Sequence, residues 1–276
     1  MLCSNVQYLR FPLDFFTESQ KQLNTHIIEF YAAVPHLWCD HYGYSQTDVD
    51  TIRTLFNKAG LKIAAYTPKA YTYSLLADQG TELAEVTRNY YLNSIAVANS
   101  LGARMLVLDI VNHCRDYEDV RLRDNLMVSV LPILGEAEKY NITLLIGRTV
   151  KDEWPFLYTP NDFNAIVDEI ASKNLRLYLD TAAISSRCET IDGWFSVAGK
   201  YISYVRFVDG RYGRSSIWGE GVLPCARMLR MLLKYYDGYL SLFCQSEAYI
   251  DSPDKADKKN LAWLDAAAAH LSNRDY

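Results

Sequence analysis

The sequence has 276 residues, of which 50% are hydrophobic and 22% are charged, and its formal net charge is −5. This length and composition are typical of one globular domain with a sizeable core. The weak negative charge, without a basic run, argues against a nucleic-acid partner, and no apolar stretch reaches the roughly 20 residues of a membrane span.

The sequence favours a cytoplasmic protein without a bound cofactor. The first residues, MLCSNVQYLRF, lack the basic and then long apolar pattern of a signal peptide. The six cysteines are scattered without CxxC or CxH spacing, which is typical of reduced thiols. No Walker loop, HExxH motif, dinucleotide fingerprint or Ser-His-Asp arrangement is found.

Along the chain, segments typical of strands alternate with segments typical of helices. The first four predicted pairs are Leu2–Val6 and Pro12–Leu23, His26–Tyr31 and Thr47–Ala59, Lys62–Tyr66 and Glu82–Leu101, and Met105–Leu108 and Arg121–Tyr140. The last four are Thr143–Ile146 and Asn161–Ile170, Arg176–Leu179 and Ile191–Val197, Ile202–Val208 and Leu223–Lys234, and Tyr239–Cys244 and Pro253–Leu271. In each pair the strand precedes the helix.

Eight such pairs in one chain predict the α/β class and a single (β/α)8 TIM barrel spanning residues 1–276. A doubly wound open sheet is the competing fold. That fold would be expected to show a Gly-rich phosphate turn after the first strand, and none is present. In a TIM barrel the functional groups lie at the carboxyl ends of the strands.

Two of the predicted strands end in charged residues. LRLYLD ends at Asp180, and YISYVRFVDG contains Arg206 and Asp209. A buried arginine is costly unless a carboxylate or a ligand meets it. We therefore expect these strand ends to form the floor of a site. One hypothesis is that Arg206 pairs with Asp180 and binds a sugar oxygen, carboxylate or phosphate; the alternative is that the two residues only neutralise each other.

Several stretches carry a resemblance to a known family. They are IIEFYAAVPHLW, AAYTPKAYTYSLLAD, YTPNDF, RLYLD, VRFVDG and WGEG, and they span nearly the whole chain. In wording and order they resemble the sugar phosphate isomerase/epimerase family, with its xylose isomerase-like TIM barrel, and within it the fructoselysine 3-epimerase branch. The resemblance implies a sugar or sugar phosphate as ligand, and a homo-oligomer.

The resemblance also implies a divalent metal held by Glu, Asp, His and Glu at the ends of the last four strands, with the two Glu as acid/base pair. In this sequence these positions fall on Gly147, Asp180, Arg206 and Phe243, or on Cys244 if the last register shifts by one. One aspartate cannot hold a hard divalent ion tightly, and a nearby guanidinium would repel it. We therefore expect no metal.

Other polar residues are candidates for contacting a ligand at the carboxyl ends of the barrel strands, which we call the mouth of the barrel. Glu29 in the second strand is read either as support or as a catalytic group, and His113 after the fourth strand either as solvated or as catalytic. Tyr66 and Lys69 would contact the ligand, and Glu247 would supply a carboxylate if the last strand slips in register. The expected substrate-binding set is therefore Glu29, Tyr66, Lys69, His113, Asp180, Arg206 and Glu247, with Asp180, Arg206 and His113 as catalytic candidates.

Three functional interpretations remain open on the sequence. The first is a metal-free, catalytically altered or inactive relative that binds a sugar-like ligand. The second is an active isomerase or epimerase that uses other residues or a rescued metal site. The third is a non-catalytic subunit beside an active paralogue. Whether the protein is an enzyme is thus left open.

Overall fold

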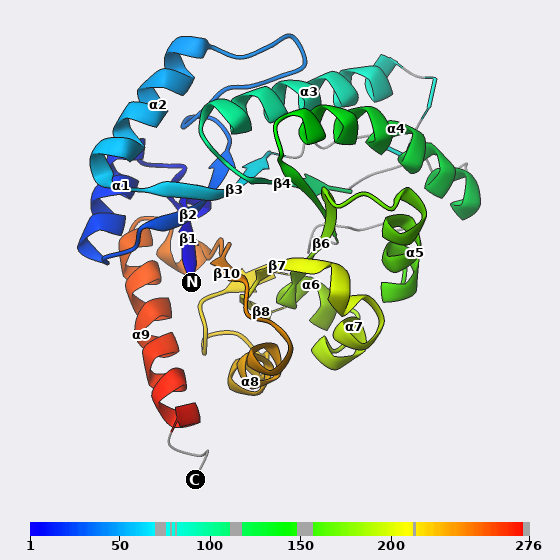
Figure 1. Ribbon diagram of the computed structural model, residues 1–276. Helices are drawn as coiled ribbons and strands as arrows, with labels where there is room; N and C mark the ends of the chain where they lie inside the picture. Colours follow the sequence, from blue (N-terminus) through cyan, green and yellow to red (C-terminus); the bar gives the residue numbers. More distant parts are fainter. Residues whose placement is uncertain are drawn as a thin grey trace.

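Eight parallel strands form a closed barrel with helices around it in the computed structural model (Figure 1). The structure describes residues 1–69, 76–77, 79–80, 82–110, 118–147, 157–211 and 214–272. Around the barrel the strands follow the order β1, β10, β7, β6, β5, β4, β3, β2, with β1 closing against both β10 and β2. The predicted (β/α)8 barrel is confirmed.

All sixteen predicted elements are present, with boundaries shifted by at most two residues. The barrel strands are β1 (Leu2–Ser4), β2 (Ile27–Ala32), β3 (Lys62–Pro68), β4 (Met105–Asp109), β5 (Thr143–Gly147), β6 (Leu175–Asp180), β7 (Ile202–Arg206) and β10 (Tyr239–Leu242). The predicted helices are α1 (Leu13–Gln22), α2 (Gln46–Ala59), α3 (Glu82–Ser100), α4 (Asp119–Lys139), α5 (Pro160–Ile170), α7 (Ile191–Ala198), α8 (Cys225–Tyr235) and α9 (Pro253–Ser272).

The structure adds short elements near the strand ends that the sequence pattern did not predict. A helix, α6 (Thr181–Ser185), follows β6 directly, and an antiparallel pair, β8 (Asp209–Arg211) and β9 (Arg214–Ser216), follows β7. Three 3-10 helices lie at Asn5–Tyr8, Gly199–Tyr201 and Glu247–Tyr249. Each is shorter than the window in which hydrophobic periodicity distinguishes a helix from a strand.

Alternation along the strands divides the apolar residues into two clusters. One set fills the interior of the barrel and includes Leu2, Ala65, Val107, Tyr178 and Tyr204. The larger set packs between the outside of the barrel and the helices. Because side chains alternate between the two faces of a strand, the next inward positions after the interior cluster lie at the carboxyl-terminal mouth.

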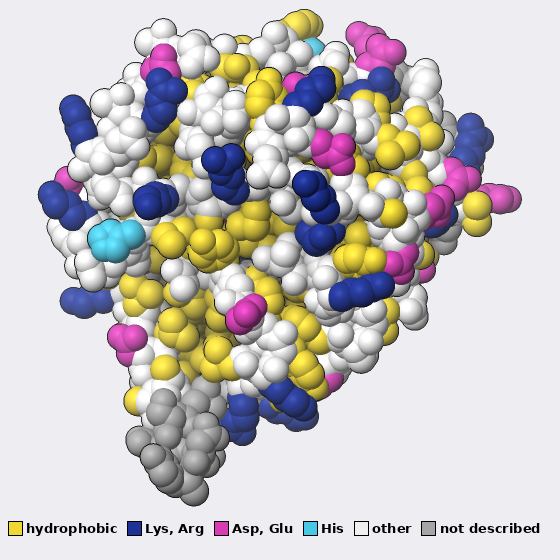
Figure 2. Space-filling view, in the orientation of Figure 1, with side chains coloured by type: hydrophobic (Ala, Val, Ile, Leu, Met, Phe, Trp, Pro, Cys, Tyr) yellow, Lys and Arg dark blue, Asp and Glu magenta, His cyan; other side chains and the backbone are white. Residues whose placement is uncertain are grey.

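Among the described helices, none is both long and apolar enough to cross a membrane. On the face drawn in Figure 2, basic and acidic side chains are interspersed around apolar areas.

A buried carboxyl group joins the last helix to the first. Asp257 in α9 accepts hydrogen bonds from the Tyr8 hydroxyl (2.7 Å) and from Nε2 of Gln20 in α1 (3.0 Å). Its side chain is buried, and burial raises the pKa of Asp257 to about 7. These contacts attach α9 to the start of the chain, close to β1.

Candidate functional site

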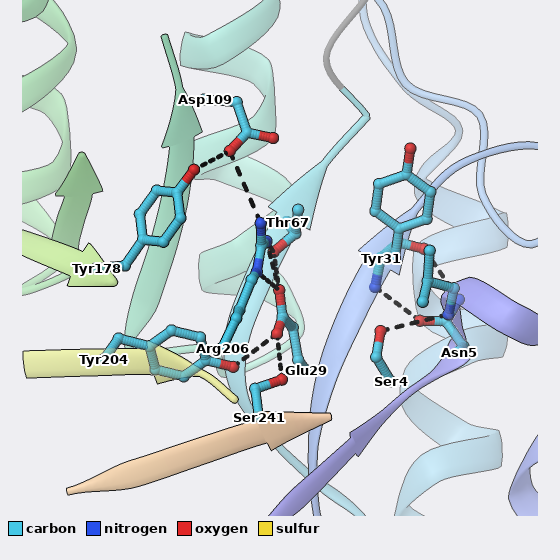
Figure 3. Close-up of polar contacts among 11 residues, drawn as sticks. Ser4, Asn5, Glu29, Tyr31, Thr67, Asp109, Tyr178, Tyr204, Arg206 and Ser241 are labelled. Atoms are coloured by element: carbon cyan, nitrogen blue, oxygen red, sulfur yellow. Dashed lines mark hydrogen bonds and ion pairs between the residues drawn. The ribbon is translucent and has the colours of Figure 1, made fainter. Parts of the chain in front are cut away.

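The mouth of the barrel contains a buried guanidinium at the end of β7. Arg206 is only 1% exposed, and its Nε and Nη2 both donate to Oε1 of Glu29 in β2, at 3.1 and 2.6 Å. Glu29 is completely buried. Figure 3 shows the two side chains meeting across the barrel interior. A charge-assisted, two-point contact of this kind is the arrangement in which an arginine is tolerated in a protein core.

Three hydroxyl groups complete the surroundings of Glu29. Thr67 of β3 donates to Oε1 at 2.6 Å and accepts from Nη2 of Arg206 at 3.0 Å. The Tyr204 hydroxyl donates to Oε2 at 2.8 Å, and the Ser241 hydroxyl donates to the same oxygen. Every side chain of this network lies at an inward position of its strand, so the buried charges have partners that the barrel register fixes.

On its other side Arg206 faces a second carboxylate and two aromatic rings. Its Nη1 lies 3.8 Å from Oδ1 of Asp109 at the end of β4, and Oδ1 accepts the Tyr178 hydroxyl at 2.6 Å. The guanidinium carbon lies 5.0 Å from the centre of the Tyr178 ring and 3.9 Å from that of Phe243. Such contacts between a guanidinium and ring faces stabilise the cation.

The carboxylates keep Arg206 charged. Burial alone would lower its pKa, but the charges of Glu29 and Asp109 outweigh burial and raise the pKa above its ordinary value. For Tyr178, burial followed by the neighbouring Asp109 charge raises the hydroxyl pKa well above 10. Tyr178 therefore stays a neutral hydrogen-bond donor.

The prediction that Arg206 pairs with Asp180 is wrong. The two residues are register partners in the β6–β7 ladder, but the carboxylate that Arg206 contacts is Glu29. Oδ1 of Asp180 instead accepts from the amides of Ala182 and Ala183, at 2.9 and 3.0 Å, and so caps α6. Burial raises the pKa of Asp180 to about 6, against the lowering effect of those amides and of Arg206.

Asp209 also lies elsewhere than expected. Its buried carboxylate accepts from four backbone amides, of Gly210 (2.7 Å) and of Gly219, Gly221 and Leu223 (3.0 Å each). It thus holds the loop that contains WGEG. This is a structural role away from the floor that the strand pattern predicted.

At the positions where the resemblance implies metal ligands, the residues of this chain pack against neighbouring side chains of the centre. At Gly147 an added Cβ would lie 2.8 Å from two Tyr178 ring carbons and closer still to the Tyr178 carbonyl oxygen. Phe243, at the last position, stacks on Arg206, while Cys244 is buried. Within the described ranges, no three His, Cys, Asp or Glu side chains are grouped so that they could hold a metal ion. Of the described residues, the donors at these positions do not make up the set of ligands that a divalent metal ordinarily takes.

Three of the other candidates, Tyr66, Lys69 and Glu247, lie outside this centre. Tyr66 is buried beside Phe30 in the core between barrel and helices. Lys69 follows β3 and is exposed. Glu247 has a side chain 78% exposed, and it pairs with Arg214. His113 lies outside the described residues. The structure therefore brings together Glu29 and Arg206, with Asp180 on the neighbouring strand.

The sequence analysis missed five members of the centre: Thr67, Asp109, Tyr178, Tyr204 and Ser241. Asp109 had a usable signal, because it ends an apolar strand in the way that Asp180 does. The other four are ordinary residues for a strand, and only the register of the closed barrel brings them together.

Comparison with known proteins agrees with this architecture. The family model described as "Xylose isomerase-like TIM barrel" matches residues 21–267. A search of the curated proteins found no match.

Three solved structures illustrate the likeness. A D-tagatose 3-epimerase-like protein has a TM-score of 0.77 at 17% identity, over 98% of this chain and 100% of the other. D-psicose 3-epimerase from Clostridium cellulolyticum H10 has a TM-score of 0.74 at 15% identity, over 98% and 99%. An L-ribulose 3-epimerase has a TM-score of 0.73 at 17% identity, over 96% and 92%. At these identities the likeness shows the fold.

Proposed function

The chain belongs to the xylose isomerase-like TIM barrel family, and from that premise we propose that it binds a sugar at the carboxyl-terminal mouth of the barrel without a divalent metal. The solved relatives include proteins named as D-psicose and L-ribulose 3-epimerases, which supports a sugar as the ligand class. The carboxyl ends of the strands are where TIM-barrel proteins bind their ligands.

The observation that supports metal independence is the pairing of Arg206 with Glu29. A permanent cation stands at a position where the resemblance implies a metal ligand, and its guanidinium is buried beside two aromatic rings. Both oxygens of Glu29 already accept hydrogen bonds, from Arg206 and from three hydroxyl groups, so this carboxylate is not free to hold a metal ion. In this proposal Arg206 supplies the positive charge toward ligand oxygens that a metal supplies elsewhere.

Metal analysis combined with ligand titration tests the proposal. We expect protein purified without chelator to contain far less than one manganese, magnesium, cobalt or zinc ion per chain. D-tagatose, titrated by isothermal calorimetry, should bind equally well with and without EDTA. The Arg206→Met variant should lose this binding. A stoichiometric metal whose removal abolishes binding would refute metal independence, and no binding of any ketose would refute the sugar site.

A second candidate, an active epimerase or isomerase that uses other residues, is favoured by Asp180. Burial raises the pKa of its carboxyl to about 6, a value suited to taking up and releasing a proton near neutral pH. Incubation of D-tagatose and D-fructose with the enzyme in deuterated water, in the presence of EDTA, distinguishes this candidate. Deuterium incorporated beside the carbonyl, and absent for Asp180→Asn, would support it; no incorporation would favour binding without catalysis.

A further inference from the structure

Three polar atoms at the mouth make no hydrogen bond to another residue that the structure describes. They are Oδ2 of Asp109, Oδ2 of Asp180 and Nη1 of Arg206, which ends 3.8 Å from Asp109, beyond hydrogen-bond length. The Asp109 side chain is 13% exposed. In Figure 3 its second oxygen is directed away from both Tyr178 and Arg206. Nη1 of Arg206, a donor on a side chain that is 99% buried, thus lies close to the partly exposed carboxylate of Asp109, which is an acceptor.

A donor beside an acceptor is complementary to neighbouring oxygen atoms on a sugar. The Asp109 carboxylate can accept a hydrogen bond from a hydroxyl group, and Nη1 of Arg206 can donate one to the adjacent hydroxyl or carbonyl oxygen. Tyr178 fixes the Asp109 carboxylate from the opposite side, and Phe243 covers one face of the guanidinium. This pair can therefore hold a vicinal diol or an α-hydroxy ketone with little rearrangement.

The charges of the same residues disfavour an anion. Arg206 is the one guanidinium of the described centre, and it pairs with Glu29 and Asp109. One cation against two carboxylates leaves the described part of this centre with more negative than positive charge, and the side chains are largely buried, where screening by solvent is weak. Lys69 is exposed at the end of β3, so its charge is largely screened.

From these observations we infer that Asp109 is a ligand-contacting residue which, together with Arg206, selects an unphosphorylated ketose over its phosphate ester. The inference rests on the proposed sugar site and narrows the ligand class from sugars or sugar phosphates to uncharged sugars. It also assigns a function to a residue that the resemblance does not single out.

A matched pair of probes tests the inference. Dissociation constants of D-tagatose and D-tagatose 6-phosphate are measured by calorimetry at pH 8, with inorganic phosphate as a competitor. We expect the wild-type protein to bind the free sugar at least about tenfold more tightly than the ester. Inorganic phosphate at millimolar concentration should not compete. In Asp109→Asn, which keeps the shape but removes one negative charge, the preference should shrink to a few-fold.

Asp50→Asn is the control, since it also removes one negative charge but from an exposed position on α2, where Asp50 pairs with Arg53. It should retain the wild-type preference. Equal or tighter binding of the ester by the wild type, or an unchanged preference in a folded Asp109→Asn protein, would overturn the selection and leave the sugar site intact. If neither probe binds the wild type, the proposed sugar site fails and the inference fails with it.

Discussion

The ring of Tyr178 occupies the space in which a side chain at position 147 would lie. β5 and β6 are neighbours in the barrel, and Gly147 ends β5 with no side chain. Any Cβ there would lie closer to the Tyr178 ring and to its backbone carbonyl oxygen than van der Waals contact allows. The Tyr178 hydroxyl then reaches Asp109, which faces Arg206. The glycine and the arginine are thus two parts of one connected centre.

Gly147→Ala should therefore destabilise the protein, and Gly147→Glu should do so more strongly without creating a metal site. Overpacking of this kind costs about 1 to 3 kcal/mol, and part of the clash is with backbone, which cannot rotate away. Urea unfolding measures the loss. Gly135→Ala is the matched control, because an added Cβ on that exposed helical residue meets nothing within 4 Å; it should be neutral or stabilising. A stable Gly147→Glu protein that binds one metal per chain would contradict this account.

How much of the centre can be read from the sequence depends on the kind of residue. Arg206 and Asp180 are recognisable because a charge inside an apolar strand requires an explanation. The partner of Arg206 is not recognisable, because Glu29 is far away in the sequence and meets Arg206 only across the closed barrel. The nearest carboxylate along the ladder, Asp180, is the natural guess, and it is wrong because its oxygen caps α6.

The ion pair itself gives a second prediction. Arg206→Met leaves Glu29 charged, completely buried and without its cation, which should lower the free energy of unfolding by about 3 to 5 kcal/mol. Adding Glu29→Gln to Arg206→Met removes the stranded charge and should recover part of that loss. Chemical denaturation of the two single variants and the double variant measures the coupling. Additive losses would show that the two residues do not stabilise each other.

Asp209 allows a prediction about one loop. Its carboxylate accepts from the amides of Gly219, Gly221 and Leu223, and a Cβ at Gly221 would clash with Asp209 Oδ1. Asp209→Ala should therefore increase hydrogen exchange at these amides at least about tenfold, since losing their acceptors frees the loop to open locally. Amides of the β4–β5 ladder serve as the internal control and should keep their protection. Unchanged exchange in the loop would show that other contacts hold it.

The fold was more predictable than the site for a physical reason. Periodicity and Gly signals are local, so elements such as α2, which is capped at its carboxyl end by Gly60 with φ +70°, are visible in a short window of sequence. The β8–β9 pair was missed because three-residue strands have no periodicity, and Asp209 was assigned to the preceding strand. Contacts across the barrel depend on register, which a single sequence does not specify.

The last prediction concerns pH and the carboxyl group of Asp257. Burial raises its pKa in the folded protein to about 7, whereas an unfolded aspartate has a pKa near 3.9. Between these values the folded state binds more protons than the unfolded state, so the contribution of Asp257 to stability falls as pH rises from about 4 to about 7. By linkage the total loss is roughly 2 to 4 kcal/mol.

Asp257→Asn removes the titration but keeps an oxygen that can accept from Tyr8 and Gln20. The difference in free energy of unfolding between wild type and variant, measured in urea at pH 5, 6, 7 and 8, should shift in favour of the variant as pH rises. The exposed Asp50→Asn substitution provides the control, and its difference from wild type should stay flat over this range. If the Asp257→Asn difference is also flat, the buried carboxyl does not titrate in this window, and the attachment of α9 to α1 does not depend on pH.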